Sequence, residues 1–337
     1  MKIKYYLLTL LVVAMSFIAC EGDDGLVDPV DAKDRTEQQV EDKAELIDYL
    51  ETHYYNSGFF SGNTNPLIDD VVITKLEDGE VVPADHTLLI DAVRTETTTF
   101  VDVAYEYYIL ELNLGGGEVP HFSDNIRLKY SGNLLDGEVF DSSVSPVDFD
   151  LVNLIAGWSR VIPQFKAAVS YEENSDGTIS FDDSGVGVMF LPSGLAYFSE
   201  PQDGITAYSQ LVFKFELYQT EVNDHDFDGI PTYLEDLNNN LNTNDDDTDS
   251  NNFPNFIDPD DDGDGVLTFN ELEPKVHTVN TNEGDLEPIL GAREFEISRS
   301  EENGIITIVT VIIVDSNNDG LDDYLDENIS IDYNEES

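Results

Sequence analysis

The chain has 337 residues, of which 40% are hydrophobic and 10% aromatic, so it can bury at least one apolar core. Its 71 acidic residues against 15 lysines and arginines give a formal net charge of −56. A field of this sign repels phosphate backbones and attracts cations, which excludes nucleic acid as a partner. Such self-repulsion also opposes compaction, unless bound metal ions neutralise part of it.

Residues 1–19 have the features of an export signal. Lys2 and Lys4 precede an apolar run over 5–19 that is too short to span a bilayer comfortably. The run ends at Cys20, the single cysteine, so no intrachain disulfide can form. This arrangement resembles a bacterial lipoprotein signal, in which the cysteine is lipidated and becomes the new N-terminus. The resemblance predicts a membrane anchor at Cys20 and a place in the outer membrane or at the cell surface, with the periplasmic face left open. The alternatives are an ordinary secretory signal and a buried core cysteine.

A polar tether and a mixed helical and β segment follow. Residues 20–35 are acidic and lack periodicity, as expected of a tether. In the segment 36–115, a helix is predicted from Thr36, which can form a capping box with Gln39. Its apolar positions recur every three or four residues and are Val40, Ala44, Ile47, Leu50 and Tyr54. Short apolar runs then predict strands up to the glycines at 115–117, and the sequence assigns this segment no function.

Residues 116–221 have the clearest β pattern. Apolar and polar side chains alternate over 126–130 and over 211–217, so one face of each predicted strand is buried. Between these strands, residues 163–170 are predicted to form a short helix with Pro163 in its first turn.

The order of motifs over 119–219 resembles that of the FKBP-type peptidyl-prolyl isomerases. Y-S-G at 130–132 is followed by L-L-D-G at 134–137, V-F-D-S-S at 139–143 and P-S-G-L-A-Y at 192–197. The resemblance implies an α+β fold in which an antiparallel sheet wraps on a short helix. It also implies isomerisation of X-Pro bonds in exported, proline-containing polypeptides, without a cofactor for catalysis.

The chemistry of this reaction suits an aromatic pocket. An X-Pro bond isomerises slowly because twisting the amide costs about 18–20 kcal/mol. The twisted amide is less dipolar than the planar one, so an apolar, water-poor pocket favours it. By resemblance, the apolar residues of the pocket would be Tyr130, Phe140, Val161, Ile162, Ile205, Phe213 and, as its floor, Phe165. Asp141 and Tyr197 would supply the polar contacts.

The floor of the pocket departs from the family pattern. The family usually has Trp at the floor, where Phe165 is assigned here, and Gln164 stands where a Gly usually precedes it. Trp158 is assigned to an insertion over 152–160 and is not equated with the floor. A peptide-binding or chaperone module that uses the same fold without catalysis is the alternative function.

Residues 222–275 carry Asp and Asn at the spacing of calcium loops. Such a loop places oxygen ligands at positions 1, 3 and 5, Gly at position 6 and a carboxylate at position 12. Loop 1 (224–235) and loop 4 (260–271) fit in full, with ligands Asp224, Asp226, Asp228, Glu235, Asp260, Asp262, Asp264 and Glu271. Loop 5 (315–326), in the C-terminal segment 276–337, has the ligands Asp315, Asn317, Asp319 and Asp326.

Two further loops fit imperfectly, because Leu241 and Asn252 stand where Gly is expected. The predicted ligands of loop 2 (236–247) and loop 3 (247–258) are Asp236, Asn238, Asn240, Asp247, Asp249, Asn251 and Asp258. Loops 1 to 4 follow one another so closely that paired helices cannot fit between them. They resemble thrombospondin type-3 repeats, which implies structural Ca²⁺ and little regular secondary structure.

The acidic region also leaves two other interpretations open. A disordered acidic tail is the usual explanation of a charge run. A calcium-stabilised structural lipoprotein at the cell surface is a third function. Residues 276–314 regain β character, with an apolar run over 305–314.

Overall fold

The computed structural model describes residues 32–63 and 65–334. The chain divides into a short unit over 1–33 and a second unit over 34–337. The predicted signal, Cys20 and most of the tether lie outside the described residues. Within the described ranges, no helix combines the length and apolar character needed to cross a bilayer.

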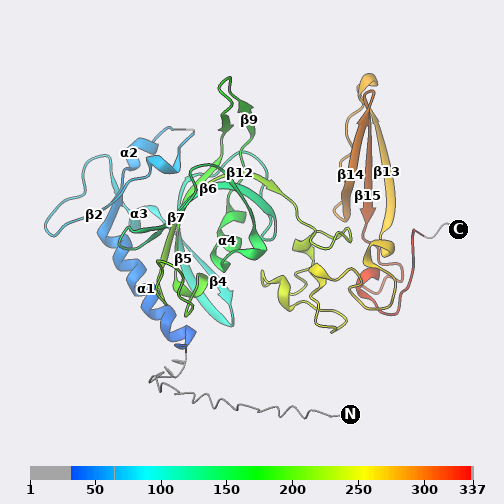
Figure 1. Cartoon of the computed structure of the whole chain (residues 1–337), viewed down its shortest axis with the longest axis horizontal. Coiled ribbons are helices and arrows are strands. Elements are labelled where there is room, and N and C mark those ends of the chain that lie inside the picture. The colour runs from blue at the N-terminus through cyan, green and yellow to red at the C-terminus, as the bar shows by residue number, and fades with distance from the viewer. Residues whose placement is uncertain (1–31, 64, 335–337) are drawn as a thin grey trace, which may run out of the picture. The chain divides into compact units, whose positions relative to one another are not determined.

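A seven-stranded antiparallel sheet carries the β segments predicted over 126–130 and 211–217 (Figure 1). Its strands follow the order β4-β5-β11-β12-β6-β7, and β8 pairs with β6. They are β4 (Arg94–Phe100), β5 (Val103–Asn113), β6 (Asn125–Leu134), β7 (Val139–Ser142), β8 (Val147–Asp150), β11 (Gly185–Leu191) and β12 (Leu211–Glu221). Because β4 and β5 precede residue 116, the sheet crosses the predicted boundary of the isomerase-like domain.

The short helix α4 (Ala156–Val161) packs on one face of this sheet. The helix predicted over 163–170 is therefore wrong: a 3-10 turn at Ile162–Gln164 follows α4, and the backbone is extended at Phe165. Gly157 lets α4 approach β11 closely, since a Cβ at this position would lie 2.3 Å from the Leu191 side chain. The helix begins seven residues earlier than predicted.

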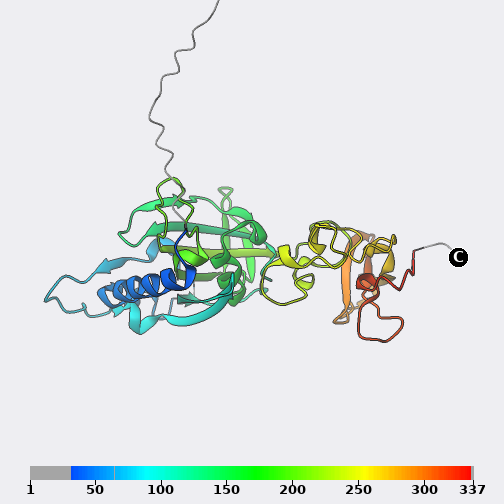
Figure 2. The same cartoon turned by 90° about the horizontal axis from the view of Figure 1, so that it is seen from below.

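The longer helix α1 (Arg35–Thr52) covers the other face, and Figure 2 shows it lying alongside the strands. Strand pleating divides β11 between the two cores: Met189 faces the α4 side, while Val188 and Phe190 pack with Leu46 and Leu50 of α1. The sheet is thus buried on both faces.

The start and buried stripe of α1 differ from the prediction. Asp34 is the N-cap, and its carboxylate accepts hydrogen bonds from the backbone N–H groups of Thr36 (2.9 Å) and Glu37 (3.0 Å). Val40 is 68% exposed, and Tyr54 lies in a strand. The polar Asp42 lies in the buried stripe, because its carboxylate accepts hydrogen bonds from Ser193 and Gln210.

Smaller elements complete this part of the chain. A three-stranded sheet is formed by β1 (His53–Tyr55), β2 (Ile73–Lys75) and β3 (Thr87–Leu88). Two short helices are α2 (Ser57–Phe60) and α3 (Leu89–Ala92). A separate hairpin consists of β9 (Ser170–Glu173) and β10 (Ile179–Asp182).

The acidic loops consist of turns and short 3-10 segments, as predicted. The β character predicted over 276–314 is confirmed by the antiparallel sheet β13-β15-β14, formed by β13 (Glu273–Asn280), β14 (Glu294–Glu302) and β15 (Ile305–Ile312). A small apolar core joins this sheet to the loops and contains Ile230, Leu272, Val311, Ile313 and Tyr324.

Candidate functional site

A hollow of about 180 Å³ opens beside α4. Its lining consists of Tyr130, Phe140, Asp141, Phe149, Asn153, Leu154, Ile155, Trp158, Tyr197 and Phe213. Five predicted site residues therefore meet in one place, namely Tyr130, Phe140, Asp141, Tyr197 and Phe213. A larger hollow of about 620 Å³, at the edge where β6 pairs with β8, has mainly polar lining residues and no comparable group of rings.

Aromatic rings form the walls and floor of the smaller hollow. The Trp158 ring lies 5.0 Å from the Phe213 ring and 6.1 Å from the Tyr130 ring, nearly perpendicular to the latter. Phe140 meets Phe213 edge to face at 5.5 Å. Gly132 makes this pair possible, because a Cβ there would lie 2.6 Å from the Phe140 ring and 2.8 Å from that of Phe213.

The predicted floor is corrected by this arrangement. Val161, Ile162 and Phe165 are fully buried and do not line the hollow. Phe165 instead packs edge to face on Phe215 at 4.9 Å, within the core behind the hollow. Trp158 takes the floor position.

A local signal for the true floor was present in the sequence. Leu154, Ile155, Gly157 and Trp158 supply an apolar pair and then the Gly-Trp pair that the family pattern requires, and the absence of Gly at position 164 pointed the same way. Ile205 is buried in the same core but is not among the lining residues.

Two phenols and one carboxylate provide the polar groups of the hollow. The Tyr130 hydroxyl donates a hydrogen bond of 2.5 Å to Asp141 Oδ2. Burial raises the pKa of Tyr130 well above its ordinary value, and the bond to Asp141 raises it further. Burial, followed by the charge of Asp141, also raises the pKa of Tyr197. The Tyr197 hydroxyl donates no hydrogen bond to any acceptor among the described residues. This protonated phenol can therefore donate to a ligand.

Loops 1 and 4 hold their carboxylates in a common arrangement. Backbone N–H groups donate to one oxygen of the aspartates at positions 3 and 5 of each loop; for example, Ile230 N–H donates to Asp228 Oδ1 and Val266 N–H to Asp264 Oδ1, both at 2.7 Å. The second oxygens of Asp226, Asp228, Asp262 and Asp264 are buried and have no hydrogen-bond partner within the described residues. In each loop, one oxygen from each of the first three ligands lies within 4.8 Å of the others.

The electrostatics of these two loops favour a bound cation. Burial, and then the neighbouring carboxylates, raise the pKa of Asp228 to about 8 and that of Glu271 to about 9. A buried carboxylate without a partner is costly, and a divalent cation with oxygen ligands would remove that cost. Gly229 and Gly265 adopt φ values of 95° and 97°, as position 6 of the motif requires.

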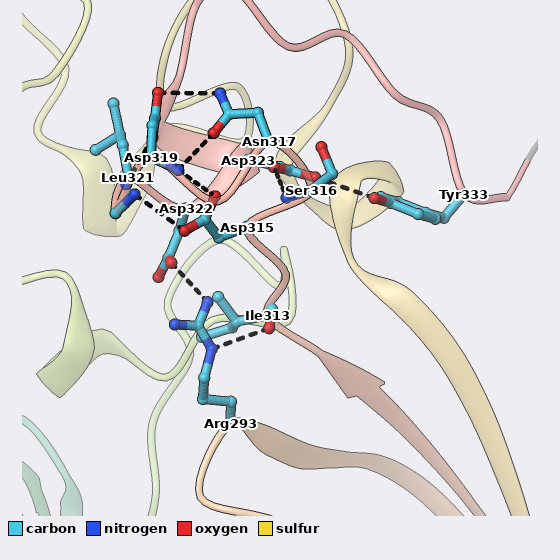
Figure 3. A network of polar contacts seen from close by, with 11 residues as sticks. Arg293, Ile313, Asp315, Ser316, Asn317, Asp319, Leu321, Asp322, Asp323 and Tyr333 are labelled. Atoms are coloured by element: carbon cyan, nitrogen blue, oxygen red, sulfur yellow. Dashed lines mark hydrogen bonds and ion pairs between the residues drawn. The ribbon is translucent and has the colours of Figure 1, made fainter.

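Loops 3 and 5 differ, because an asparagine amide occupies the space between their carboxylates. In loop 5, Asn317 Nδ2 donates to Asp319 Oδ2 at 3.0 Å (Figure 3). It also donates to Asp326 Oδ2 at 3.1 Å. In loop 3, Asn251 Nδ2 donates in the same way to Asp249 (3.0 Å) and Asp258 (2.6 Å). Within the described residues, neither loop gathers three acidic ligands.

Loop 2 keeps the turn of the motif despite its missing glycine. Leu241 adopts a φ of 63°, and Asn252 at the same position of loop 3 adopts 76°. The Asp236 carboxylate accepts hydrogen bonds from the backbone N–H groups of Asn240 (3.0 Å) and Leu241 (2.8 Å). The side-chain amides of Asn238 and Asn240 donate to Asp246 and Asp245. The loop geometry therefore survives, with a strained backbone at Leu241.

Comparison with known proteins assigns the two regions to different families. Residues 116–218 match the family model of the FKBP-type peptidyl-prolyl cis-trans isomerases. Residues 225–290 match the model described as BamM C-terminal. The resemblance of the loops to thrombospondin type-3 repeats is not among these matches and stays a prediction.

Individual relatives match through the same middle segment. The FKBP-type 22 kDa peptidyl-prolyl cis-trans isomerase of Escherichia coli is 29% identical over 111 residues, which are 32% of this chain and 47% of that protein. The outer membrane protein MIP of Legionella longbeachae is 29% identical over 110 residues, 32% of this chain and 40% of that protein. The crystal structure of FkpA from Escherichia coli has 27% identity and a TM-score of 0.30, and the match covers 39% of this chain and 52% of that one.

The chain therefore contains an FKBP-type domain at 116–218, and the predicted FKBP-like fold of this region is confirmed. The chain spans less than half the length of the curated relatives it matches.

Proposed function

We propose that the FKBP-type domain catalyses cis/trans isomerisation of X-Pro bonds in polypeptides outside the cytoplasm and so assists their folding. The observation that carries this proposal is the ring-lined hollow of Tyr130, Trp158 and Phe213, with Asp141 and Tyr197 at its polar side. The name of the Escherichia coli relative, a peptidyl-prolyl cis-trans isomerase, supports the same reaction class.

The residues of the hollow suit the demands of the reaction. A proline ring fits over the Trp158 floor between the aromatic walls, which offer it apolar surface. The Tyr197 hydroxyl donates to a substrate carbonyl, and Tyr130 fixes the Asp141 carboxylate by the bond of 2.5 Å. The apolar surroundings favour the twisted, less dipolar amide over the planar one. This chemistry requires no nucleophile and no metal.

A proline-limited refolding reaction tests the enzymatic proposal. The purified chain accelerates the slow refolding phase, and Tyr197→Phe reduces the acceleration. Tyr171→Phe serves as the matched control, because Tyr171 is exposed on the β9 hairpin. Equal refolding rates with and without the chain would refute catalysis, and peptide binding without a rate effect would favour the non-catalytic chaperone.

We also propose that loops 1 and 4 bind structural calcium. The supporting observation is the set of buried carboxylate oxygens without partners in these loops. The ligands predicted for loops 2, 3 and 5 are proposed as weaker sites. In loops 3 and 5 an asparagine amide already contacts the predicted carboxylates, and in loop 2 the predicted ligand Asn238 donates to Asp246 instead. Calorimetric titration with calcium tests this: we expect binding to the parent chain and a reduced number of bound ions in Glu271→Gln. A titration without heat or stoichiometric binding would refute it.

A lipid anchor at Cys20 is proposed from the sequence pattern alone, and the name of the Legionella relative is consistent with an envelope location. Cys20→Ala should move the protein from the membrane fraction to the soluble fraction of a producing cell. Retention in the membrane fraction would contradict the anchor.

A further inference from the structure

A second group of carboxylates lies beside loop 1, and one member comes from loop 4. Ligand oxygens of Asp228, Glu235 and Asp261 all lie within 4.8 Å of one another. Asp228 and Glu235 occupy positions 5 and 12 of loop 1. Asp261, however, occupies position 2 of loop 4, which the calcium-loop motif does not use.

All three side chains of this group are buried without partners. Their exposed fractions are 2% for Asp228 and 1% each for Glu235 and Asp261. Both carboxylate oxygens of Glu235 and of Asp261, and one of Asp228, have no hydrogen-bond partner within the described part of the chain. None of the ion pairs found among the described residues involves these three side chains. Three adjacent buried negative charges without a compensating group are strongly unfavourable.

The group is held in place from both loops. Asp228 Oδ1 accepts a hydrogen bond of 2.7 Å from the backbone N–H of Ile230, a residue of the small apolar core. On the side of loop 4, the backbone N–H of Asp261 donates to Thr268 Oγ1 at 3.2 Å, and Thr268 is fully buried. The carboxylates are thus positioned by their backbones rather than by contacts with one another.

We propose that Asp228, Glu235 and Asp261 form a further divalent-cation site, which shares Asp228 and Glu235 with loop 1, takes Asp261 from loop 4 and so joins the two loops. Its ion is calcium, since the three carboxylates offer five oxygens without partners, and calcium takes hard oxygen ligands with water completing its coordination. Asp228 bridges this ion and that of loop 1, because it also belongs to the group with Asp224 and Asp226. The inference rests on the proposed calcium binding of loops 1 and 4.

The bridging ion has a structural consequence that the separate loops do not have. Each loop motif closes only its own twelve residues, whereas this site connects residues 228 and 261 across the intervening loops. An ion at this position therefore cross-links the repeat region, much as a disulfide would, and loops 2 and 3 lie within the closed segment.

The number of bound calcium ions tests the inference on the full chain. We expect Asp261→Asn, which keeps the side-chain volume, to bind one ion fewer than the parent chain in equilibrium dialysis. Glu273→Gln is the control: it removes one negative charge from an exposed position of the repeat region that is not a predicted ligand, and it keeps the parent number. Asp226→Asn serves as the comparison variant, because it removes a ligand that belongs to loop 1 alone. It should lose one ion, and the double variant Asp226→Asn/Asp261→Asn should lose two.

The possible failures are distinguishable. A parent chain that binds no calcium overturns the proposal for the loops and this inference together. A parent that binds calcium, with an unchanged number in Asp261→Asn, overturns only the bridging site. The same holds if the double variant loses no more ions than Asp226→Asn alone.

Discussion

The FKBP-type domain and the acidic repeats bury opposite kinds of side chain. The domain closes its sheet over rings and aliphatic groups such as Trp158, Phe165 and Phe215, whose burial is favourable without any ligand. The repeats bury carboxylates such as Glu235 and Glu271, whose burial is favourable only with a cation. The comparison teaches that one chain can contain a region whose apolar content suffices for its core and another whose buried charges lead us to propose that its folding depends on bound ions.

Removal of calcium should produce the largest difference between the two regions. With a chelator, the repeats should lose protease resistance, since each site saturated at 1,000 times its dissociation constant contributes about 4 kcal/mol. The FKBP-type domain should stay resistant, because none of its core residues is a predicted ligand. Limited proteolysis followed by mass spectrometry measures both. Identical digestion patterns with calcium and with chelator would contradict the contrast.

Replacement of the pocket floor should affect only the FKBP-type domain. Trp158→Leu should lower turnover per folded molecule on the order of tenfold, corresponding to about 1.4 kcal/mol of lost transition-state stabilisation. Phe165→Leu is the matched control: it should lower stability by roughly 1–2 kcal/mol but leave turnover per folded molecule unchanged, because Phe165 does not line the hollow. If Phe165→Leu proved the more damaging to turnover, the reassignment of the floor would be wrong.

The sequence predicted the continuous part of this pocket and missed the discontinuous part. Tyr130, Phe140 and Asp141 lie in one run of characteristic spacing, so they were placed correctly. The floor was missed because the apolar pair Val161-Ile162 was matched to the family pattern, although the pair Leu154-Ile155 is the one that Gly157 and Trp158 follow. Asp261 was missed for a different reason, because a loop motif describes ligands close in sequence, whereas this residue meets Glu235 only through folding.

A smaller effect is expected from the single phenol that faces the hollow. Tyr197→Phe removes one donor, so it should cost about 1 kcal/mol of transition-state stabilisation, or roughly a fivefold loss of turnover. Its thermal stability should match that of the parent, since no hydrogen bond of the Tyr197 hydroxyl is present among the described residues. A loss of stability equal to the loss of activity would contradict a role in substrate contact.

The smallest effect concerns acid sensitivity of the C-terminal sheet. His277, and then Thr310 and Lys275, hold the pKa of Glu294 at about 2 through hydrogen bonds, against a contribution from burial. The folded-state pKa is thus below the unfolded one, so this stabilisation is present above the ordinary Glu value and is lost as the pH falls from about 4.5 to about 2. In urea unfolding, the parent chain should exceed Glu294→Gln in free energy of unfolding by less at pH 3 than at pH 6. An advantage independent of pH would contradict this role of the carboxylate.

The most direct test is the acceleration of a proline-limited refolding reaction by the same chain in calcium and in chelator. Every residue that lines the hollow belongs to the FKBP-type domain, so we predict acceleration of equal size in both conditions. Acceleration that is absent in both, or that disappears with the chelator, would contradict an isomerase that folds independently of its calcium-dependent repeats.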